Sequence, residues 1–194
     1  IDYVTNDSVT TIINTHPNSE YTGNNTEFPS VVNIVAHDNT RNAMQDMAPF
    51  TGSDARFLPN KTYADTLSLF SGRNQIDLYH FGRAHTDGDT VVVFPAFGLA
   101  YLGELFPSKA VPSIDVENGG SAIAFVETLT KVIATLEQVE NNDGNAFIVP
   151  GRGAPAHTGN LLTGLGSLRD LREYADFTQA FLAAVKDARS AGKT

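Results

Sequence analysis

Short apolar runs alternate with polar, glycine-containing stretches along most of the chain. Runs of strand length that are β-branched or that alternate between apolar and polar residues occur at residues 9–14, 31–36, 62–70, 75–81, 90–94, 99–102 and 146–149. Such runs, bounded by turn residues, are typical of β-strands, and we predict a strand at each of them. The turn at residues 71–74 (Ser-Gly-Arg-Asn) predicts that the strands on either side of it form a hairpin.

Apolar residues at helical spacing predict three helices. Asp38 is a suitable N-cap for the first, which is expected to end near Met47 and to turn inward Ala43, Met44 and Met47. Ser121 is expected to cap the second, which runs to about Val139 with an inner face of Ile123, Val126, Leu129, Val132, Ile133 and Leu136. Residues 161–191 are predicted to be mostly helical, with a core stripe of Leu168, Leu171, Tyr174, Phe177, Phe181, Leu182 and Val185. Strands followed by strand–helix alternation and a terminal helix indicate a single α/β (α+β) layered domain over residues 1–194.

Composition removes several classes of function. The 194 residues carry a formal net charge of -9, and an acidic chain lacks the basic face that nucleic-acid binding needs. There are no cysteines, which excludes thiolate metal sites and disulfides. We find no apolar run of membrane-spanning length and no signal peptide, so we expect a soluble protein without membrane insertion, either cytoplasmic or a secreted mature form. A small-molecule ligand or substrate remains the expected partner.

Four polar loops each follow a predicted strand, and they carry the candidate chemistry. They contain residues 16–21, His85, Glu104 and Arg152. Loops at one edge of a sheet converge in space, so these side chains are expected to meet. The irregular segment 107–120 is expected to border the same site. Among the other polar residues we expect His37 and His80 to be structural, His157 to be exposed, and Asp87 and Asp89 to brace the His85 loop.

The four loops and their flanking strands resemble the metallo-β-lactamase superfamily of zinc hydrolases, over the range from Ile12 to the last helix. Residues 14–25 (NTHPNSEYTGNN) stand where the family has NTH-x-H-x-D-H-x-GGN, and residues 82–89 (GRAHTDGD) match its G-x-x-HT-x-GD loop. Residues 103–106 (GELF) match GD-x-F, and residues 150–153 (PGRG) match PGHG. The resemblance implies an αββα sandwich and a site for two zinc ions.

Most of the implied zinc ligands are replaced. The first ion's three histidine positions hold His16, Asn18 and His85; the positions of the second ion, together with the aspartate that the family shares between the two ions, hold Glu20, Tyr21, Arg152 and Glu104. An arginine stays protonated and offers no lone pair, so no second ion is expected beside Arg152. At most one zinc is expected, held by His16, His85 and Glu104. We favour the metal-free alternative, in which Arg152 pairs with Glu20 or Glu104; an arginine between two carboxylates could hold these loops together without a metal.

Three functional hypotheses follow. In the first, the resemblance implies a single-metal hydrolase of an ester, amide or thioester-type bond, with Glu20 as general base. In the second, the protein is a non-catalytic, metal-free binding protein in which Arg152, with Asn18, recognises an anionic group of a small ligand. In the third, a metal-free enzyme uses Glu20 and Tyr21 for acid–base chemistry.

The N-terminal region is shorter than the resemblance implies. Only about a dozen residues precede the His16 loop, where the family has several strands. The first sheet is therefore expected to lack these strands and to expose an edge. A missing N-terminal part, processing of the chain, and coverage of the edge by a partner chain or by self-association all remain open.

Overall fold

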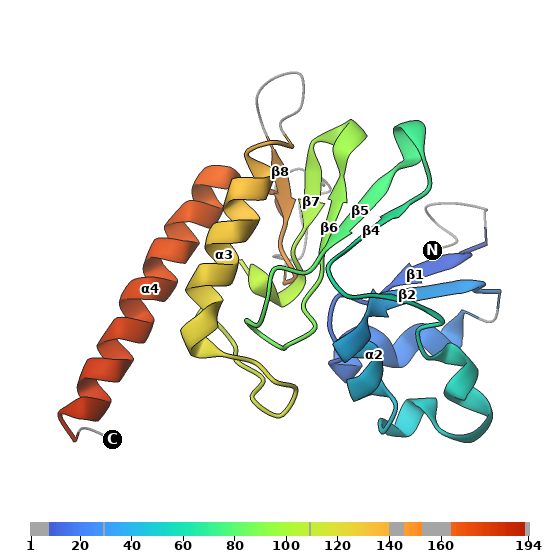
Figure 1. Ribbon diagram of the computed structural model, residues 1–194, viewed down its shortest axis with the longest axis horizontal. Coiled ribbons are helices and arrows are strands. Elements are labelled where there is room, and N and C mark those ends of the chain that lie inside the picture. The colour runs from blue at the N-terminus through green and yellow to red at the C-terminus, as the bar shows by residue number, and fades with distance from the viewer. Residues whose placement is uncertain (1–7, 29, 109, 140–145, 153–163, 193–194) are drawn as a thin grey trace.

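The protein is built from two β-sheets packed face to face, with helices on both outer surfaces (Figure 1). The computed structural model describes residues 8–28, 30–108, 110–139, 146–152 and 164–192. The predicted turn at 141–145, His157 and the predicted helical residues 161–163 lie outside these ranges. The four layers confirm the expected αββα sandwich.

The first sheet has three parallel strands in the order β1-β2-β3, which are Thr11–Ile13, Asn33–His37 and Lys61–Tyr63. Its helices are α1 and α2, Ser19–Thr22 and Asp38–Met44, with short 3-10 helices at Gly23–Glu27, Ala48–Phe50 and Gly52–Phe57. Strand β1 lies at the edge of the sheet, and within the described residues it pairs only with β2.

The second sheet has six strands in the order β4-β5-β6-β7-β8-β9. They are Thr66–Leu69, Ile76–Tyr79, Val91–Phe94, Leu99–Tyr101, Phe147–Val149 and Gly166–Ser167. Strands β7 and β8 are parallel and the other neighbours are antiparallel, including the predicted hairpin β4–β5. Helices α3 and α4, Ala122–Leu136 and Leu168–Ser190, cover its outer face, and 3-10 helices occur at Gly72–Asn74, Pro95–Phe97 and Gly103–Leu105.

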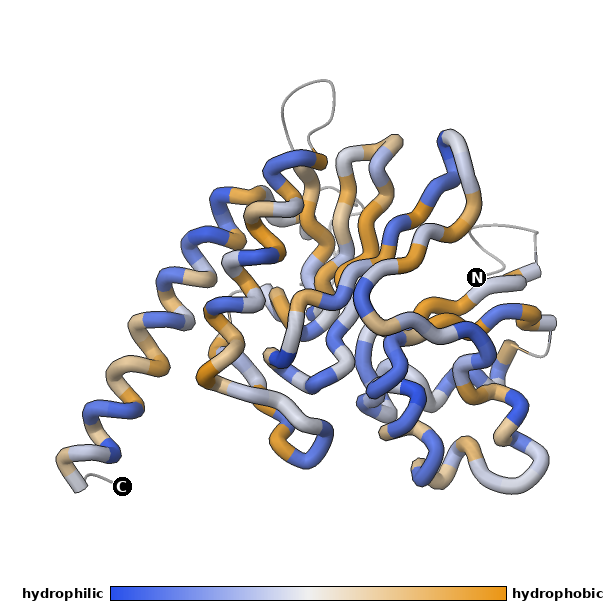
Figure 2. Tube along the Cα trace, in the orientation of Figure 1, coloured by the Kyte–Doolittle hydropathy of each residue, from blue (hydrophilic) through white to orange (hydrophobic). Residues whose placement is uncertain are grey.

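Three hydrophobic clusters fill the three spaces between these layers, where Figure 2 shows the apolar residues of the strands. Val35 of the first sheet packs against Leu78 and Val92 of the second. Between the second sheet and helices α3 and α4 lies the larger core, which includes Phe125, Leu129, Val132 and Leu171. On the outer face of the first sheet, a third cluster contains Ile34, Met44, Phe50 and Phe57. No helix in the described part of the chain combines the length and hydrophobicity that crossing a membrane requires.

The single strand predicted at 62–70 is wrong. The chain leaves the first sheet after Tyr63 and enters the second at Thr66, so β3 and β4 belong to different sheets. His37 Nε2 donates to the Ala64 carbonyl and the His80 backbone N–H donates to the Asp65 carbonyl, which fixes this crossing. Alternation gives the period of a strand but not the sheet that it joins, and the sequence therefore could not reveal the change.

The helices also differ in detail from their predicted faces. Helix α2 ends at Met44 instead of Met47, and its N-cap is His37, whose side chain accepts from the Asn39 N–H. Ser121 caps α3 as predicted, but Ile123 is 95% exposed, because the buried face of the helix is formed by Phe125, Leu129, Val132 and Leu136 and Ile123 lies off that face. The C-terminal part of α4 projects past α3 (Figure 1), and two predicted core residues of this helix, Phe177 and Val185, are about half exposed.

Candidate functional site

The His85 loop is held by a dense set of hydrogen bonds. Both carboxylate oxygens of Asp89 accept from Thr86, one from its backbone N–H at 2.9 Å and one from its hydroxyl at 2.7 Å. Helix α2 also holds the loop in place, because the side chains of Asn39 and Thr40 donate to backbone carbonyls of the loop. The predicted bracing by Asp89 is confirmed. The loop therefore presents His85 from a rigid base.

His85 has a defined tautomer. Its Nδ1 lies 3.0 Å from the carbonyl oxygen of Ser113, which can only accept a hydrogen bond. In the neutral ring Nδ1 therefore carries the proton and Nε2 presents a lone pair. His85 is 1% exposed, and its Nε2 is buried without a hydrogen-bond partner. Ser113 lies in the segment that was expected to border the site, but nothing in its sequence marked this contact.

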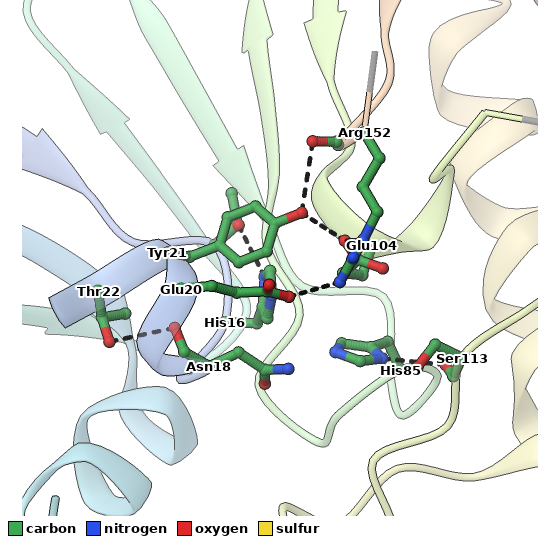
Figure 3. A network of polar contacts seen from close by, with 11 residues as sticks. His16, Asn18, Glu20, Tyr21, Thr22, His85, Glu104, Ser113 and Arg152 are labelled. Carbon is green, nitrogen blue, oxygen red and sulfur yellow. Dashed lines mark hydrogen bonds and ion pairs between the residues drawn. The ribbon is translucent and has the colours of Figure 1, made fainter. Parts of the chain in front are cut away.

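His16 lies against His85 in the middle of the site (Figure 3). The two ring centroids are 5.0 Å apart in an edge-to-face arrangement, and the Tyr21 ring is 4.2 Å from His16 on another side. His16 Nδ1 is 3.0 Å from the Thr15 hydroxyl, while Nε2 is buried without a partner. Burial, followed by the neighbouring His85 and Arg152, lowers the pKa of His16 to about 3, so the ring stays neutral.

Opposite the histidines, four side chains form what we call the Arg152 ion-pair chain: Glu20, Arg152, Glu104 and Tyr21. Arg152 donates from Nε to Glu104 at 2.7 Å and from Nη2 to Glu20 at 2.5 Å. The Tyr21 hydroxyl donates to the same Glu104 oxygen and also reaches the Gly151 carbonyl at 3.3 Å. The expected pairing of Arg152 is thus present: the guanidinium stands between the two carboxylates and donates to both.

Burial and charge shape this chain. The Glu104 side chain is 1% exposed, whereas the side chains of Arg152 and Glu20 are 54% and 55% exposed. The hydrogen bond to Glu104 and its charge raise the pKa of Arg152. Burial, and then the bond to Glu104, raise the pKa of Tyr21, which therefore keeps its proton at neutral pH. In this chain the tyrosine hydroxyl and the guanidinium both donate to one buried side chain, that of Glu104.

Backbone packing brings Glu104 and Arg152 together. A side chain at Gly151 would place its Cβ 2.3 Å from the Gly103 carbonyl oxygen, so only glycine lets these two turns approach. Gly103 itself has a φ of +50°, in the left-handed region. On the other side of the site, Asn14 and Asn25 exchange amide hydrogen bonds and fix the ends of the loop that carries His16 and Tyr21.

All seven predicted site residues lie around one space, but the predicted ligand triad is not assembled. Within the described residues, no group of three or more histidine, aspartate or glutamate side chains is placed to hold a metal ion. Glu104 is engaged by Arg152 and Tyr21. The Asn18 side-chain oxygen is buried without a partner, as are His16 Nε2 and His85 Nε2. The donor set does not fit two ions, because a guanidinium stands in the second position; it offers one ion two imidazole nitrogens and an amide oxygen.

Comparison with known proteins identifies the fold. No family model matches the sequence, and no curated relative was found. Solved structures do match: a metallo-beta-lactamase from Pontibacter korlensis (TM-score 0.66, 16% identity, 88% of this chain and 69% of that one) and the DIM-1 metallo-beta-lactamase (0.64, 13%, 87% and 68%). TMB-1 matches with a TM-score of 0.61 and 16% identity, over 87% of this chain and 66% of its own. The chain thus spans about two thirds of the length of these proteins.

Proposed function

We propose that this chain, which has the metallo-β-lactamase fold, is a small-molecule-binding protein whose cleft works without a pair of zinc ions. One observation carries the proposal: the Arg152 guanidinium stands between Glu20 and Glu104, bonded to both. In this reading the side chain itself supplies the positive charge that holds the two loops together. This is the metal-free state that the sequence analysis favoured over a single-metal site.

The electrostatics support it. Arginine is protonated at every physiological pH and has no lone pair to give to a metal. At a separation of about 4 Å and an effective dielectric constant of about 20, two unit positive charges repel by roughly 4 kcal/mol. A divalent ion beside Arg152 would meet that repulsion twice over. It would also have to take Glu104 away from two hydrogen-bond donors.

A tight anion site at Arg152 is less well supported. Two of its nitrogens already donate to carboxylates, at 2.5 and 2.7 Å. An incoming anion would compete with both and would face their negative charges. The anion-binding role of Arg152 and Asn18 therefore stays a prediction, and we expect any such binding to be weak.

A single-metal hydrolase is a second candidate, favoured by three buried atoms without partners: His16 Nε2, His85 Nε2 and Asn18 Oδ1. These would hold the ion, and the hydrogen bond from His85 Nδ1 to Ser113 already orients one ligand. A bound divalent ion would supply a water of lowered pKa for hydrolysis of an ester, amide or thioester-type bond. Tyr21 would still donate to Glu104, which keeps that carboxylate away from the ion.

Elemental analysis separates the two candidates. The protein would be purified without chelator and analysed before and after addition of zinc or manganese, and its melting temperature would be compared with and without EDTA. We expect no stoichiometric metal and no shift in melting temperature with chelator. About one ion per chain that is lost in His85→Ala would instead select the hydrolase.

A further inference from the structure

Two histidines outside the cleft form a stacked pair. The ring centroids of His37 and His80 are 3.9 Å apart, with an interplanar angle of 27°. His37 ends strand β2 of the first sheet, and His80 directly follows β5 of the second. Both residues also bond to the short crossing between the sheets, at the carbonyls of Ala64 and Asp65. The pair therefore joins the two sheets.

The backbone uses both ring nitrogens of His37, which is 5% exposed. Nδ1 lies 3.2 Å from the Asn39 backbone nitrogen, which can only donate, and Nε2 lies 2.7 Å from the Ala64 carbonyl oxygen, which can only accept. The ring is therefore neutral, with its proton on Nε2, and in this form it is the N-cap of helix α2. A second proton would sit on Nδ1 and face the Asn39 N–H. Charging the ring and capping the helix thus exclude each other.

The capped first turn of α2 is also the part of this helix that holds the His85 loop. The Asn39 side chain donates to the Asp87 carbonyl and the Thr40 hydroxyl donates to the Gly88 carbonyl, each at 2.9 Å. The packing is close, since a Cβ at Gly88 would lie 2.7 Å from the Thr40 backbone nitrogen. A movement of this turn therefore has to displace the loop as well.

The groups that face His37 determine the sign of its response to pH. Burial, and then the neighbouring His80, lower the pKa of His37, while the carboxylates of Asp38 on α2 and Asp87 in the loop act in the opposite direction. From β3, Tyr63 contacts His37 edge-to-face at 5.7 Å, and burial raises the pKa of this tyrosine, so it stays uncharged. Folded His37 thus takes up its proton at a lower pH than in the unfolded chain.

We propose that the His37–His80 pair is an acid-sensitive latch on the His85 loop: a proton on His37 removes the N-cap of α2, and the first turn of α2 then releases the loop. A charged His80 would repel a charged His37 at this separation, so the doubly protonated pair has to open. His80 Nδ1 also lies 2.9 Å from the Asp89 carbonyl, so opening of the pair disturbs the loop at a second place. The latch does not depend on what the cleft binds, and the elemental analysis judges the proposed function separately.

Amide hydrogen exchange, followed by NMR without any ligand, tests the latch. Protection factors of the Asp87 and Gly88 amides would be measured at about pH 7 and about pH 4.5, with the Val132 amide in the middle of α3 as an internal reference. We expect the two loop amides to lose roughly tenfold in protection at the lower pH, the size of one lost helix cap. The protection of Val132 should change by less than about twofold, because the opening is local.

Two cap exchanges form a matched pair of variants. His37→Asn and Ser121→Asn each replace one helix cap by another good one, but the Ser121 cap of α3 does not titrate. We expect His37→Asn to remove most of the pH dependence of the loop amides and Ser121→Asn to leave it unchanged.

Three results would overturn the latch. Equal loosening of the loop in His37→Asn would assign the effect to another group, such as Asp89, whose pKa is raised by burial. Loop amides of the unaltered protein that keep their protection at the lower pH would show that no latch opens. A joint loss of protection at Asp87, Gly88 and Val132 would show global unfolding instead of local release.

Discussion

The two sides of the cleft differ in how their polar side chains are held. On the His85 side, Asp89 braces the loop and the Ser113 carbonyl orients an imidazole whose Nε2 has no partner. On the Arg152 side, the guanidinium and the Tyr21 hydroxyl are already bonded to carboxylates. One side is thus a rigid loop that presents a free acceptor, and the other is a network whose charged groups are paired with one another.

The largest effect should come from replacing side chains on the Arg152 side of the cleft. The triple variant Arg152→His, Asn18→His, Tyr21→His removes the guanidinium and adds three imidazoles at positions where the resemblance implies zinc ligands. We expect it to bind at least about one zinc ion per chain, since three or four such ligands form a zinc site. The check is elemental analysis after zinc addition and dialysis.

The single variant Arg152→Gln is the control for the triple variant, because it removes the positive charge without adding a ligand. It should stay metal-free. If the triple variant gains no zinc, the assignment of these three positions to the ligand sites is wrong.

The packing of the His85 loop can be disrupted by a substitution that removes no polar side chain. A Cβ at Gly120 would lie 2.1 Å from the His85 carbonyl oxygen, so Gly120→Ala must displace the loop. We expect it to lower the free energy of unfolding by roughly 2–3 kcal/mol, measured by urea denaturation. Gly23→Ala is the matched control, since nothing lies within 4 Å of its added Cβ, and it should change stability by less than about 0.5 kcal/mol. Equal effects of the two would mean that the His85 loop is not closely packed.

The Arg152 side should contribute less to stability than the His85 loop. Arg152→Gln leaves the buried Glu104 with Tyr21 as its remaining side-chain donor, and we expect a loss of roughly 1–2 kcal/mol, less than for a fully buried pair because Arg152 is half exposed. Arg172→Gln removes a half-exposed arginine from its pair with Glu137, whose side chain is 47% exposed, and should cost about 0.5 kcal/mol or less. Denaturation of the two variants side by side measures the difference. If the first costs no more than the second, the ion-pair chain does not stabilise the cleft.

The smallest effect concerns pH. Burial, and then the stacked His80 at 3.9 Å, lower the pKa of His37, while Asp38 and Asp87 act in the opposite direction. Below pH about 6.5 His37 is protonated in the unfolded chain but stays neutral in the folded protein. The free energy of unfolding should therefore fall by roughly 1 kcal/mol or less as the pH decreases toward the lowered pKa of folded His37. His37→Asn keeps an N-cap for α2 but does not titrate, and its stability should depend less on pH. Identical pH profiles would assign the dependence to other groups.

The sequence predicted the layers of this fold well, and the chemistry of its cleft only in outline. The β4–β5 hairpin and the Ser121 cap follow from local signals. The burial of Thr128 on the inner face of α3 could not be predicted from local signals. It depends on a partner far away in the sequence, because the Thr128 hydroxyl donates to the carbonyl of Arg83. The pairing of Arg152 could be expected from charge alone. That it holds two carboxylates at once depends on the close approach of Gly103 and Gly151, which composition does not reveal.

The guanidinium in the cleft is a cation that cannot diffuse away. A zinc ion occupies its site according to how much free metal its surroundings offer, whereas Arg152 is tethered to the chain, and its effective concentration beside Glu20 and Glu104 is set by the loop alone. The cleft should therefore keep the same shape under zinc starvation and zinc excess.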